Sequence, residues 1–138
     1  MTTLLRWGIL GTGSIAHTFA DDFRFNTTGV VTAVGSRAQS SANRFGDEFA
    51  IPHRHASYES LVNDPDVDVV YVGSPHPMHF ANASLALHHH KPVLVEKAFT
   101  MNSAEARQLV SVARQRGLFM MRQCGLDSYR TWRLFGRC

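Results

Sequence analysis

A glycine-rich segment near the start of the chain has the residue types and spacing that hold a dinucleotide pyrophosphate. Gly11-Thr12-Gly13-Ser14-Ile15 follows a short apolar run and precedes apolar residues at helical spacing. Gly11 permits a sharp strand-to-helix turn, and Gly13 lets a pyrophosphate approach the backbone. The helix that follows offers free N–H groups and a positive dipole end to that anion. The segment therefore predicts a dinucleotide site, with an ordinary glycine-rich turn as the alternative.

Ser36 and Arg37 follow the next apolar run, at the position that selects between the two nicotinamide cofactors. A carboxylate there accepts hydrogen bonds from a free ribose 2′-hydroxyl, whereas an arginine accommodates a 2′-phosphate. The first carboxylate after this position is Asp47. A hydroxyl beside a guanidinium suits a phosphate because such contacts are charge-assisted. We therefore expect NADP, with NAD as the second choice; the alternative is that Arg37 is a solvated surface residue.

A proline-rich loop follows the fourth apolar run and carries Ser74, Pro75, His76 and His79. Ligands of open parallel sheets lie at the carboxyl ends of the strands, so this loop is expected to face the cofactor. For either histidine, packing or helix capping is an equally good interpretation. The sequence offers this pair no third or fourth ligand, so no metal is expected.

Glu96 and Lys97 follow the apolar run 93–95, where a charge is expensive unless it is paired. A lysine at the carboxyl end of a strand, beside a nicotinamide, could polarise or protonate a carbonyl oxygen during hydride transfer. The alternative is a structural ion pair, either between these two side chains or with a neighbouring residue. The residues by themselves leave both interpretations open.

Alternating strand and helix patterns predict how these residues are positioned. Strands are expected at 4–10, 29–35, near 55–56, and at 67–73, 93–95 and 118–121. Helices are expected at 15–23, after Arg37 through Ala42, Phe45 and Phe49, and at 58–62, 76–90 and 103–116, the last opened by a capping box. The connections are short enough to favour parallel crossovers. The sequence therefore predicts an α/β fold, a doubly wound parallel sheet of the Rossmann dinucleotide-binding type, over residues 1–121.

Composition and charge exclude several classes of function. Of the 138 residues 44% are hydrophobic, as in globular domains, and no apolar run approaches the roughly 20 residues of a membrane span. Four arginines and one aspartate follow residue 121, and the ten basic and ten acidic residues before it balance. A neutral body lacks the electrostatic footprint for nucleic acid. Two late cysteines make no disulfide framework, and no signal-peptide pattern is present, so the expected compartment is the cytoplasm.

Four motifs together resemble those of the glucose–fructose oxidoreductase/inositol dehydrogenase family, also called Gfo/Idh/MocA, in its dihydrodiol dehydrogenase-like branch. They are residues 11–16, 36–37, 75–79 and 96–99, in the family's order. The resemblance implies NAD(P)-dependent hydride transfer involving a sugar, polyol or cyclic diol. It also implies that Lys97 is the catalytic lysine of a Glu-Lys-Pro motif, in which this chain has Ala98.

Members of that family are much longer and carry a second α+β domain with an open sheet. By resemblance, that domain supplies the substrate pocket, a further catalytic Tyr or His and usually the interface of a homo-oligomer. We therefore expect this chain to be a truncated N-terminal cofactor domain that is inactive alone. The alternatives are a non-catalytic NADPH-binding module and a non-functional fragment.

Residues 122–138 depart from the pattern of the chain, because the charge shifts and no helix or strand period is clear. Members of the branch resemble Met-Glu-Ala-Met-Trp-Thr-Arg-Phe-Leu-Pro after the sixth strand. If synonymous codons are chosen freely and one base is restored after the codon of Met121, this chain encodes the same ten residues. We therefore hypothesise a one-base deletion near codon 122 and expect a basic tail that is poorly ordered or weakly docked after Met121. A genuine divergent terminus is the alternative.

Overall fold

The computed structural model describes residues 5–23, 29–74, 78–95, 103–118, 120–123 and 132–134. The strands are β1 (Leu5–Leu10), β2 (Gly29–Gly35), β3 (His53–His55), β4 (Val69–Val72), β5 (Val93–Val95), β6 (Met120–Gln123) and β7 (Trp132–Leu134). The helices are α1 (Ser14–Phe23), α2 (Gln39–Phe49), α3 (Tyr58–Val62), α4 (His79–His88) and α5 (Ser103–Arg116). None of these helices is long and apolar enough to cross a membrane.

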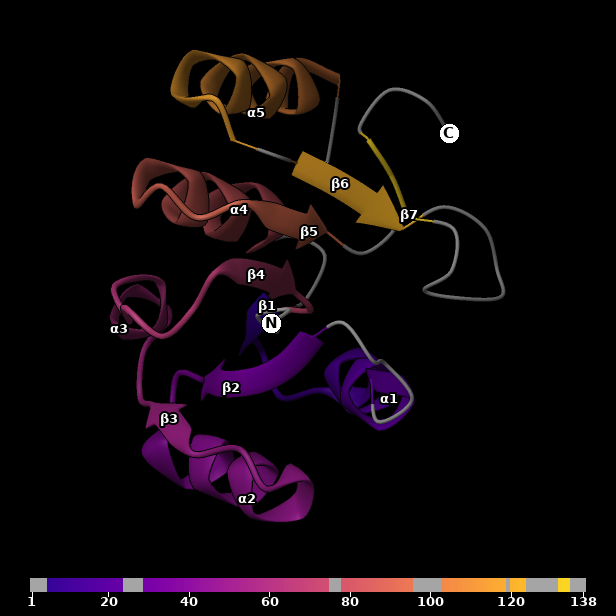
Figure 1. Cartoon of the computed structure of the whole chain (residues 1–138). Helices are drawn as coiled ribbons and strands as arrows, with labels where there is room; N and C mark the ends of the chain where they lie inside the picture. The colour runs from indigo at the N-terminus through magenta and orange to yellow at the C-terminus, as the bar shows by residue number, and fades with distance from the viewer. Residues whose placement is uncertain are drawn as a thin grey trace, which may run out of the picture.

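The described strands form one sheet in the order β3-β2-β1-β4-β5-β6-β7 (Figure 1). Strands β1 to β6 pair in parallel, and β7 pairs with β6 in antiparallel orientation. The chain runs outward from β1 to β3 and then returns to place β4 on the other side of β1. This is the doubly wound order with its topological switch between β1 and β4. The predicted fold class is confirmed.

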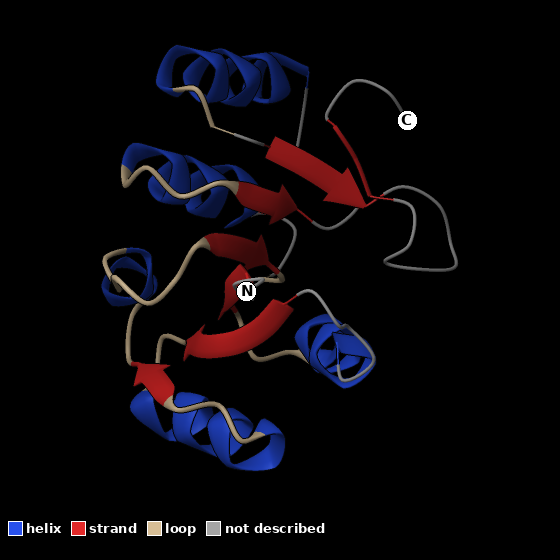
Figure 2. Cartoon of the chain, viewed as in Figure 1, coloured by secondary structure: helices blue, strands red, loops and turns tan. Residues whose placement is uncertain are grey.

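Helices cover the sheet on both faces (Figure 2). The helices α1 and α2 pack on one face, and α3, α4 and α5 pack on the other. The first core is rich in aromatic side chains: Trp7, Phe19, Phe23, Phe45 and Tyr71. The second core consists mainly of aliphatic side chains, among them Leu10, Leu61, Val70, Leu87 and Leu109. Every residue of β4 is buried, which explains why its sequence is wholly apolar rather than alternating.

Several elements have the bounds expected from the sequence, and others are shorter. The strands 29–35 and 93–95 and the helix 58–62 match the prediction. The helix expected at 76–90 is described as 79–88, and the strand expected at 67–73 is 69–72. The third strand lies at 53–55, slightly before its expected place. The helix α2 ends where Ala50 adopts a left-handed conformation with φ of 55° and its N–H donates to the carbonyl of Gly46.

The segment after residue 121 contains regular structure that its sequence does not predict. Strand β6 continues through Arg122 and Gln123, and β7 pairs with it over residues 132–134. The sequence shows no clear strand period at these residues, so local pattern gave no indication of the two strand segments. An edge of β6 with unpaired backbone groups favours strand addition, whatever side chains the added segment carries.

Candidate functional site

Three turns begin side by side at the carboxyl edge of the sheet. Leu10, the last residue of β1, is paired with Gly35 of β2 and with Val72 of β4. The turns that leave these strands are 11–13, 36–38 and 73–74. Ligands of doubly wound sheets bind outside the carboxyl ends of the strands at the topological switch point. The predicted cofactor residues on these three turns are therefore gathered at the place where such a ligand binds.

Gly11 makes the first turn in the way its sequence position predicts. It has a φ of 105°, which side-chain-bearing residues rarely adopt, and its N–H donates to the carbonyl of Gly35 at 2.9 Å. A Cβ atom at Gly11 would lie 3.0 Å from the carbonyl oxygen of Gly73 and from the nitrogen of Ser74. A Cβ at Gly13, by contrast, would meet nothing within 4 Å. Gly11 is therefore required by the fold, whereas Gly13 leaves open space through which a ligand can approach.

The N-terminus of α1 lies directly after this turn. The first four N–H groups of a helix have no partner within the helix, and here they belong to residues around Ser14 and Ile15. Ser14 is exposed, Ile15 is 45% exposed and Thr12 is half-buried. These accessible N–H groups and the positive helix end are suited to an anion such as a pyrophosphate.

The second turn holds Ser36 in place and exposes Arg37. Ser36 is buried, and its N–H donates to the carbonyl of His55 at 3.1 Å. Arg37 is exposed on the adjoining position. Asp47, the first carboxylate after this turn, accepts a 2.6 Å hydrogen bond from Arg54. The turn thus carries an exposed arginine at the carboxyl edge of the sheet, while Asp47, the first acidic residue that follows it, pairs with Arg54.

The third turn is held by a buried polar cluster at the start of α4. The Nε2 atom of His79 lies 2.8 Å from the carbonyl oxygen of Ser74, and Asn82 donates to the Ser74 hydroxyl at 2.7 Å. All three residues are at least nine-tenths buried. The buried position of His79 and its contact with Ser74 fit the packing role, which is one interpretation of this residue from the sequence. Sequence reasoning missed Asn82, although its place in the apolar stripe with Ala83 and Ala86 was the available signal.

The remaining predicted site residues, Pro75, His76, Glu96 and Lys97, lie outside the described residues. The chain enters residue 96 directly from Val95, which is paired with Val72. The roles of these four residues, including the catalytic role of Lys97, stay predictions.

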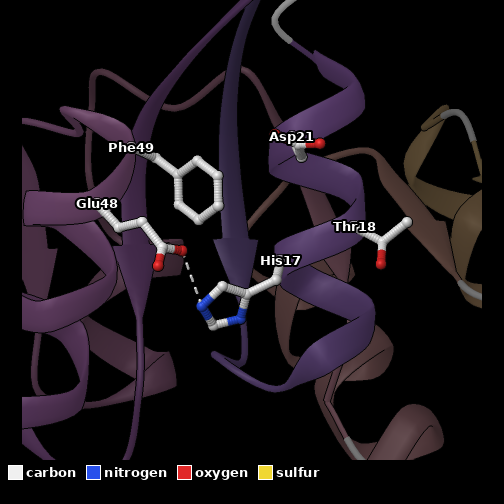
Figure 3. A pocket seen from close by; sticks show the side chains of 5 residues that line it. All are labelled: His17, Thr18, Asp21, Glu48 and Phe49. Atoms are coloured by element: carbon white, nitrogen blue, oxygen red, sulfur yellow. Dashed lines mark ion pairs between the residues drawn. The ribbon is translucent and has the colours of Figure 1, made fainter.

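A shallow hollow of about 350 Å³ lies between α1 and α2 (Figure 3). It is lined by His17, Thr18, Asp21, Glu48 and Phe49. The Nε2 atom of His17 lies 3.1 Å from a carboxylate oxygen of Glu48, and its Nδ1 lies 2.9 Å from the carbonyl oxygen of Gly13. The hollow is therefore linked through His17 to the glycine-rich turn.

An ion-pair network joins β1 to the start of β4, away from the carboxyl edge. Arg6 donates from Nε and Nη2 to the two carboxylate oxygens of Asp68, both at 3.0 Å. This hydrogen bonding, which outweighs the effect of burial, holds the pKa of Asp68 below its ordinary value. The same contact raises the pKa of Arg6. The network holds adjacent strands together and contributes no group to the candidate site.

Comparison with known proteins identifies the family. Residues 5–123 match a family model described as oxidoreductase family, NAD-binding Rossmann fold. The trans-1,2-dihydrobenzene-1,2-diol dehydrogenase of Bos taurus is 44% identical over 119 residues, which are 85% of this chain and 36% of that protein. The D-xylose 1-dehydrogenase (NADP(+)) of Hypocrea jecorina is 43% identical over 130 residues, covering 85% of this chain and 33% of that protein. The chain thus spans about a third of the length of these relatives.

Solved structures of the same fold contain NADP. KijD10, a 3-ketoreductase from Actinomadura kijaniata in complex with NADP, has a TM-score of 0.83 and 34% identity, covering 87% of this chain and 38% of that one. The biliverdin reductase of Synechocystis sp. PCC 6803, in complex with biliverdin and NADP+, has a TM-score of 0.78 and 29% identity, covering 88% and 38%. Together with the family match, these similarities confirm the resemblance drawn from the sequence motifs. The chain belongs to the Gfo/Idh/MocA family of oxidoreductases and comprises its NAD-binding Rossmann fold.

Proposed function

We propose that this chain is the N-terminal, NADP(H)-binding part of an oxidoreductase that transfers hydride between a nicotinamide and a sugar, polyol or cyclic diol. The observation that carries the proposal is the junction of Gly11, Gly35 and Gly73 at the switch point, beside the open space at Gly13. The substrate class is supported by the relatives, which are named as diol and D-xylose dehydrogenases.

The preference for NADP rests on the second turn. Ser36 is fixed by its backbone hydrogen bond to His55, and Arg37 is exposed where an adenosine 2′-phosphate lies in this fold. An arginine favours a phosphate through charge-assisted contacts, and no acidic side chain in positions 36–46 repels it. The NADP(+) dependence in the name of the D-xylose dehydrogenase supports the same choice.

Binding of the pyrophosphate is assigned to the first turn and the helix that follows. The N–H groups of residues 13–15 would hold the anion, and the lack of a side chain at Gly13 would let it reach the backbone. The nicotinamide, when bound, supplies a C4 carbon that gains or loses hydride. Lys97, by family resemblance, takes the hydroxyl proton as the carbinol carbon gives up its hydride and returns that proton in reduction.

The substrate pocket is assigned to residues beyond those of this chain. The relatives are roughly three times as long as the matched segment, so most of each relative has no counterpart here. Without the side chains that close over the nicotinamide, positioning and water exclusion are lost. We therefore propose that the 138-residue polypeptide binds the cofactor but does not turn over substrate by itself, and that oligomer contacts lie in the longer protein.

Calorimetric titration of the purified chain with NADP+ and NAD+ tests the binding part of the proposal. Tighter binding of NADP+ is expected, together with a rise in Tm. Absence of binding by a folded chain would contradict the proposal. A chain without a cooperative thermal transition would instead support the interpretation as a non-functional fragment.

Assays with sugars and diols test the catalytic part. We expect no NADPH formation above background from the chain alone. Substrate-dependent NADPH formation that disappears in the Lys97→Ala variant would overturn the proposed inactivity and would support the role of Lys97.

A further inference from the structure

Two histidines of the edge strand β3 converge on one buried carboxylate. The Nδ1 atom of His53 lies 2.7 Å from Oδ2 of Asp64, and Nε2 of His55 lies 2.8 Å from the same oxygen. Residues i and i+2 of a strand point to the same face of the sheet, so His53 and His55 place both rings on one side of β3. The Asp64 side chain is only 4% exposed, and it follows α3, so the cluster joins two elements.

The outward-facing atoms of the same three side chains have partners of their own. The Nδ1 atom of His55 lies 2.7 Å from the hydroxyl of Ser60, and Nε2 of His53 lies 3.6 Å from a carboxylate oxygen of Asp66. The Oδ1 atom of Asp64 accepts a 2.8 Å hydrogen bond from the N–H of Asp66. Three inward atoms remain, one from each side chain, and all lie within 4.8 Å of one another.

We propose that His53, His55 and Asp64 bind a divalent transition-metal ion, with zinc as the best match. Two imidazole nitrogens and a carboxylate oxygen are a common zinc ligand set. Metal–ligand bonds of about 2.0–2.1 Å in tetrahedral geometry place ligand atoms about 3.3 Å apart. The present separations of 2.7 and 2.8 Å between each ring nitrogen and the carboxylate oxygen would therefore open by roughly half an ångström. The two ring nitrogens, which lie within 4.8 Å of each other, would have to settle at the same separation of about 3.3 Å. The His53 side chain is 36% exposed, which gives a water access to the fourth position.

The outer partners fit the metal-bound state. Metal-ligating histidines usually donate their other ring N–H to a carboxylate or another oxygen, which fixes the ring. With zinc on the inner nitrogens, His55 would donate from Nδ1 to Ser60, and His53 would donate from Nε2 toward Asp66. Both ring protons would thus be carried on the outer nitrogens, where oxygen atoms already lie.

Two nearby positive charges, on Lys91 and Arg6, oppose a bound cation. The ammonium of Lys91 donates to the carbonyl oxygens of Asp64 and Val67 at 3.0 and 2.6 Å. The carboxylate of Asp66, on the outer side of His53, offsets part of this charge, although its other oxygen pairs with the guanidinium of Arg6 at 3.0 Å. The competing state is a hydrogen-bonded cluster in which both histidines donate to Asp64 without metal, and the experiment must distinguish the two.

The metal would act on the proposed cofactor edge through the backbone. The carbonyl of His55 accepts the N–H of Ser36, the residue before Arg37. A metal that fixes His55 against Asp64 would hold this end of β3 and, with it, the turn that carries the guanidinium. The site itself depends only on the geometry of β3 and Asp64, and it does not require the proposed function.

Titration of the full chain with zinc chloride after treatment with a chelator tests the proposal. We expect one bound zinc per chain and a rise in Tm, with stoichiometric binding lost in His53→Gln and Asp64→Asn. His89→Gln is the matched control, because His89 caps the C-terminus of α4 and its Nδ1 lies 2.9 Å from the carbonyl oxygen of Leu85. Ser60→Ala should weaken binding by about tenfold, as an outer partner of a ligand does. Failure to bind zinc, or binding that survives His53→Gln, would overturn the proposal.

X-ray absorption at the zinc edge of the unmodified chain keeps the test decisive if the variants do not fold. Two imidazole ligands with light oxygen ligands and no sulfur are expected. Sulfur ligation would assign the metal to Cys124 or Cys138, and three or more imidazoles would assign it to the run His88-His89-His90. Either result would contradict the proposed site. If zinc does not change the affinity for NADP+, the result contradicts only the proposed effect of the metal on the turn at Ser36, and the metal site itself stands.

Discussion

The N–H of Gly11 donates to the carbonyl oxygen of Gly35 at 2.9 Å, so the turn after β1 is bonded directly to the end of β2. The first of these residues begins the turn assigned to the pyrophosphate, and the second precedes Ser36 and Arg37. The pyrophosphate is therefore assigned to the turn after β1 and the adenosine 2′-phosphate to the turn after β2, and a hydrogen bond joins these two turns. Displacement of one turn should displace the other.

Gly11→Ala is expected to lower stability and cofactor binding together. The added Cβ would lie 3.0 Å from backbone atoms of Gly73 and Ser74, at a φ of 105°. Such backbone strain costs on the order of 1–3 kcal/mol of unfolding free energy. Gly13→Ala is the matched control, because its Cβ meets nothing within 4 Å; it should leave stability nearly unchanged and weaken NADP+ binding alone. Urea unfolding and calorimetric titration measure the two effects, and equal stability loss in both variants would contradict the assignment.

Arg37→Asp is expected to reverse the preference between NADP+ and NAD+. Loss of a charge-assisted contact, replaced by repulsion of the 2′-phosphate, should change the relative binding free energy by about 1–3 kcal/mol. The control is Arg44→Asp, which makes the same charge change at an exposed position of α2. Titration of each variant with both cofactors is the measurement. Tighter NAD+ binding by the unmodified chain would remove the basis of this prediction.

The strands β4 and β5 could be predicted because every residue in them is buried, as in strands covered on both faces. Runs such as Val69–Val72 and Val93–Val95 are wholly apolar and bounded by turn residues, which identifies them without knowledge of the partner strands. The three-residue strand β3 was harder to place, because His53, Arg54 and His55 carry no apolar pattern. Its position depends on pairing with β2, a tertiary interaction that local sequence does not encode.

In the candidate site, too, some residues can be predicted from local sequence and others depend on tertiary contacts. Gly11 was predictable because its φ of 105° favours glycine, and Gly13 because the absence of a side chain leaves open space beside the backbone. Asn82 was not identified, because its role depends on Ser74 across a loop and a helix end. The pairing of His53 and His55 with Asp64 likewise spans an intervening helix. The sequence shows only two histidines separated by one residue. It does not indicate a metal site until the fold brings the carboxylate of Asp64 beside them.

Stability is expected to fall at acid pH partly through Asp68 and Asp64. The hydrogen bond from Arg6 is the main cause of the lowered pKa of Asp68. Burial would raise the pKa of Asp64, but hydrogen bonds from His53, the Asp66 N–H and His55 together lower it. A lowered folded-state pKa means that the stabilisation is complete above the unfolded value of about 3.9 and is lost as the pH falls through the folded value.

Asp68→Asn should therefore reduce stability at pH 7 and flatten the decline below about pH 4, where the unmodified chain loses this contribution. Asp22→Asn, which makes the same substitution at an exposed position of α1, is the matched control. Urea unfolding between pH 7 and pH 2, with a chelator present, measures both. An acid decline as steep in Asp68→Asn as in the unmodified chain would show that this carboxylate is not a source of it.

Asn82→Ala is expected to destabilise the chain and to weaken cofactor binding through the third turn. The amide of Asn82 donates to the Ser74 hydroxyl at 2.7 Å in a buried position, and His79 holds the carbonyl of the same serine. Loss of a buried partner costs about 1–3 kcal/mol. Ser84→Ala is the matched control on α4, since its hydroxyl contacts only the exposed His88 among the described hydrogen bonds. Because Asn82 holds Ser74 on the third turn, NADP+ affinity should fall in Asn82→Ala and not in Ser84→Ala. A loss of stability without any loss of affinity would limit Asn82 to packing and would place Ser74 outside the cofactor site.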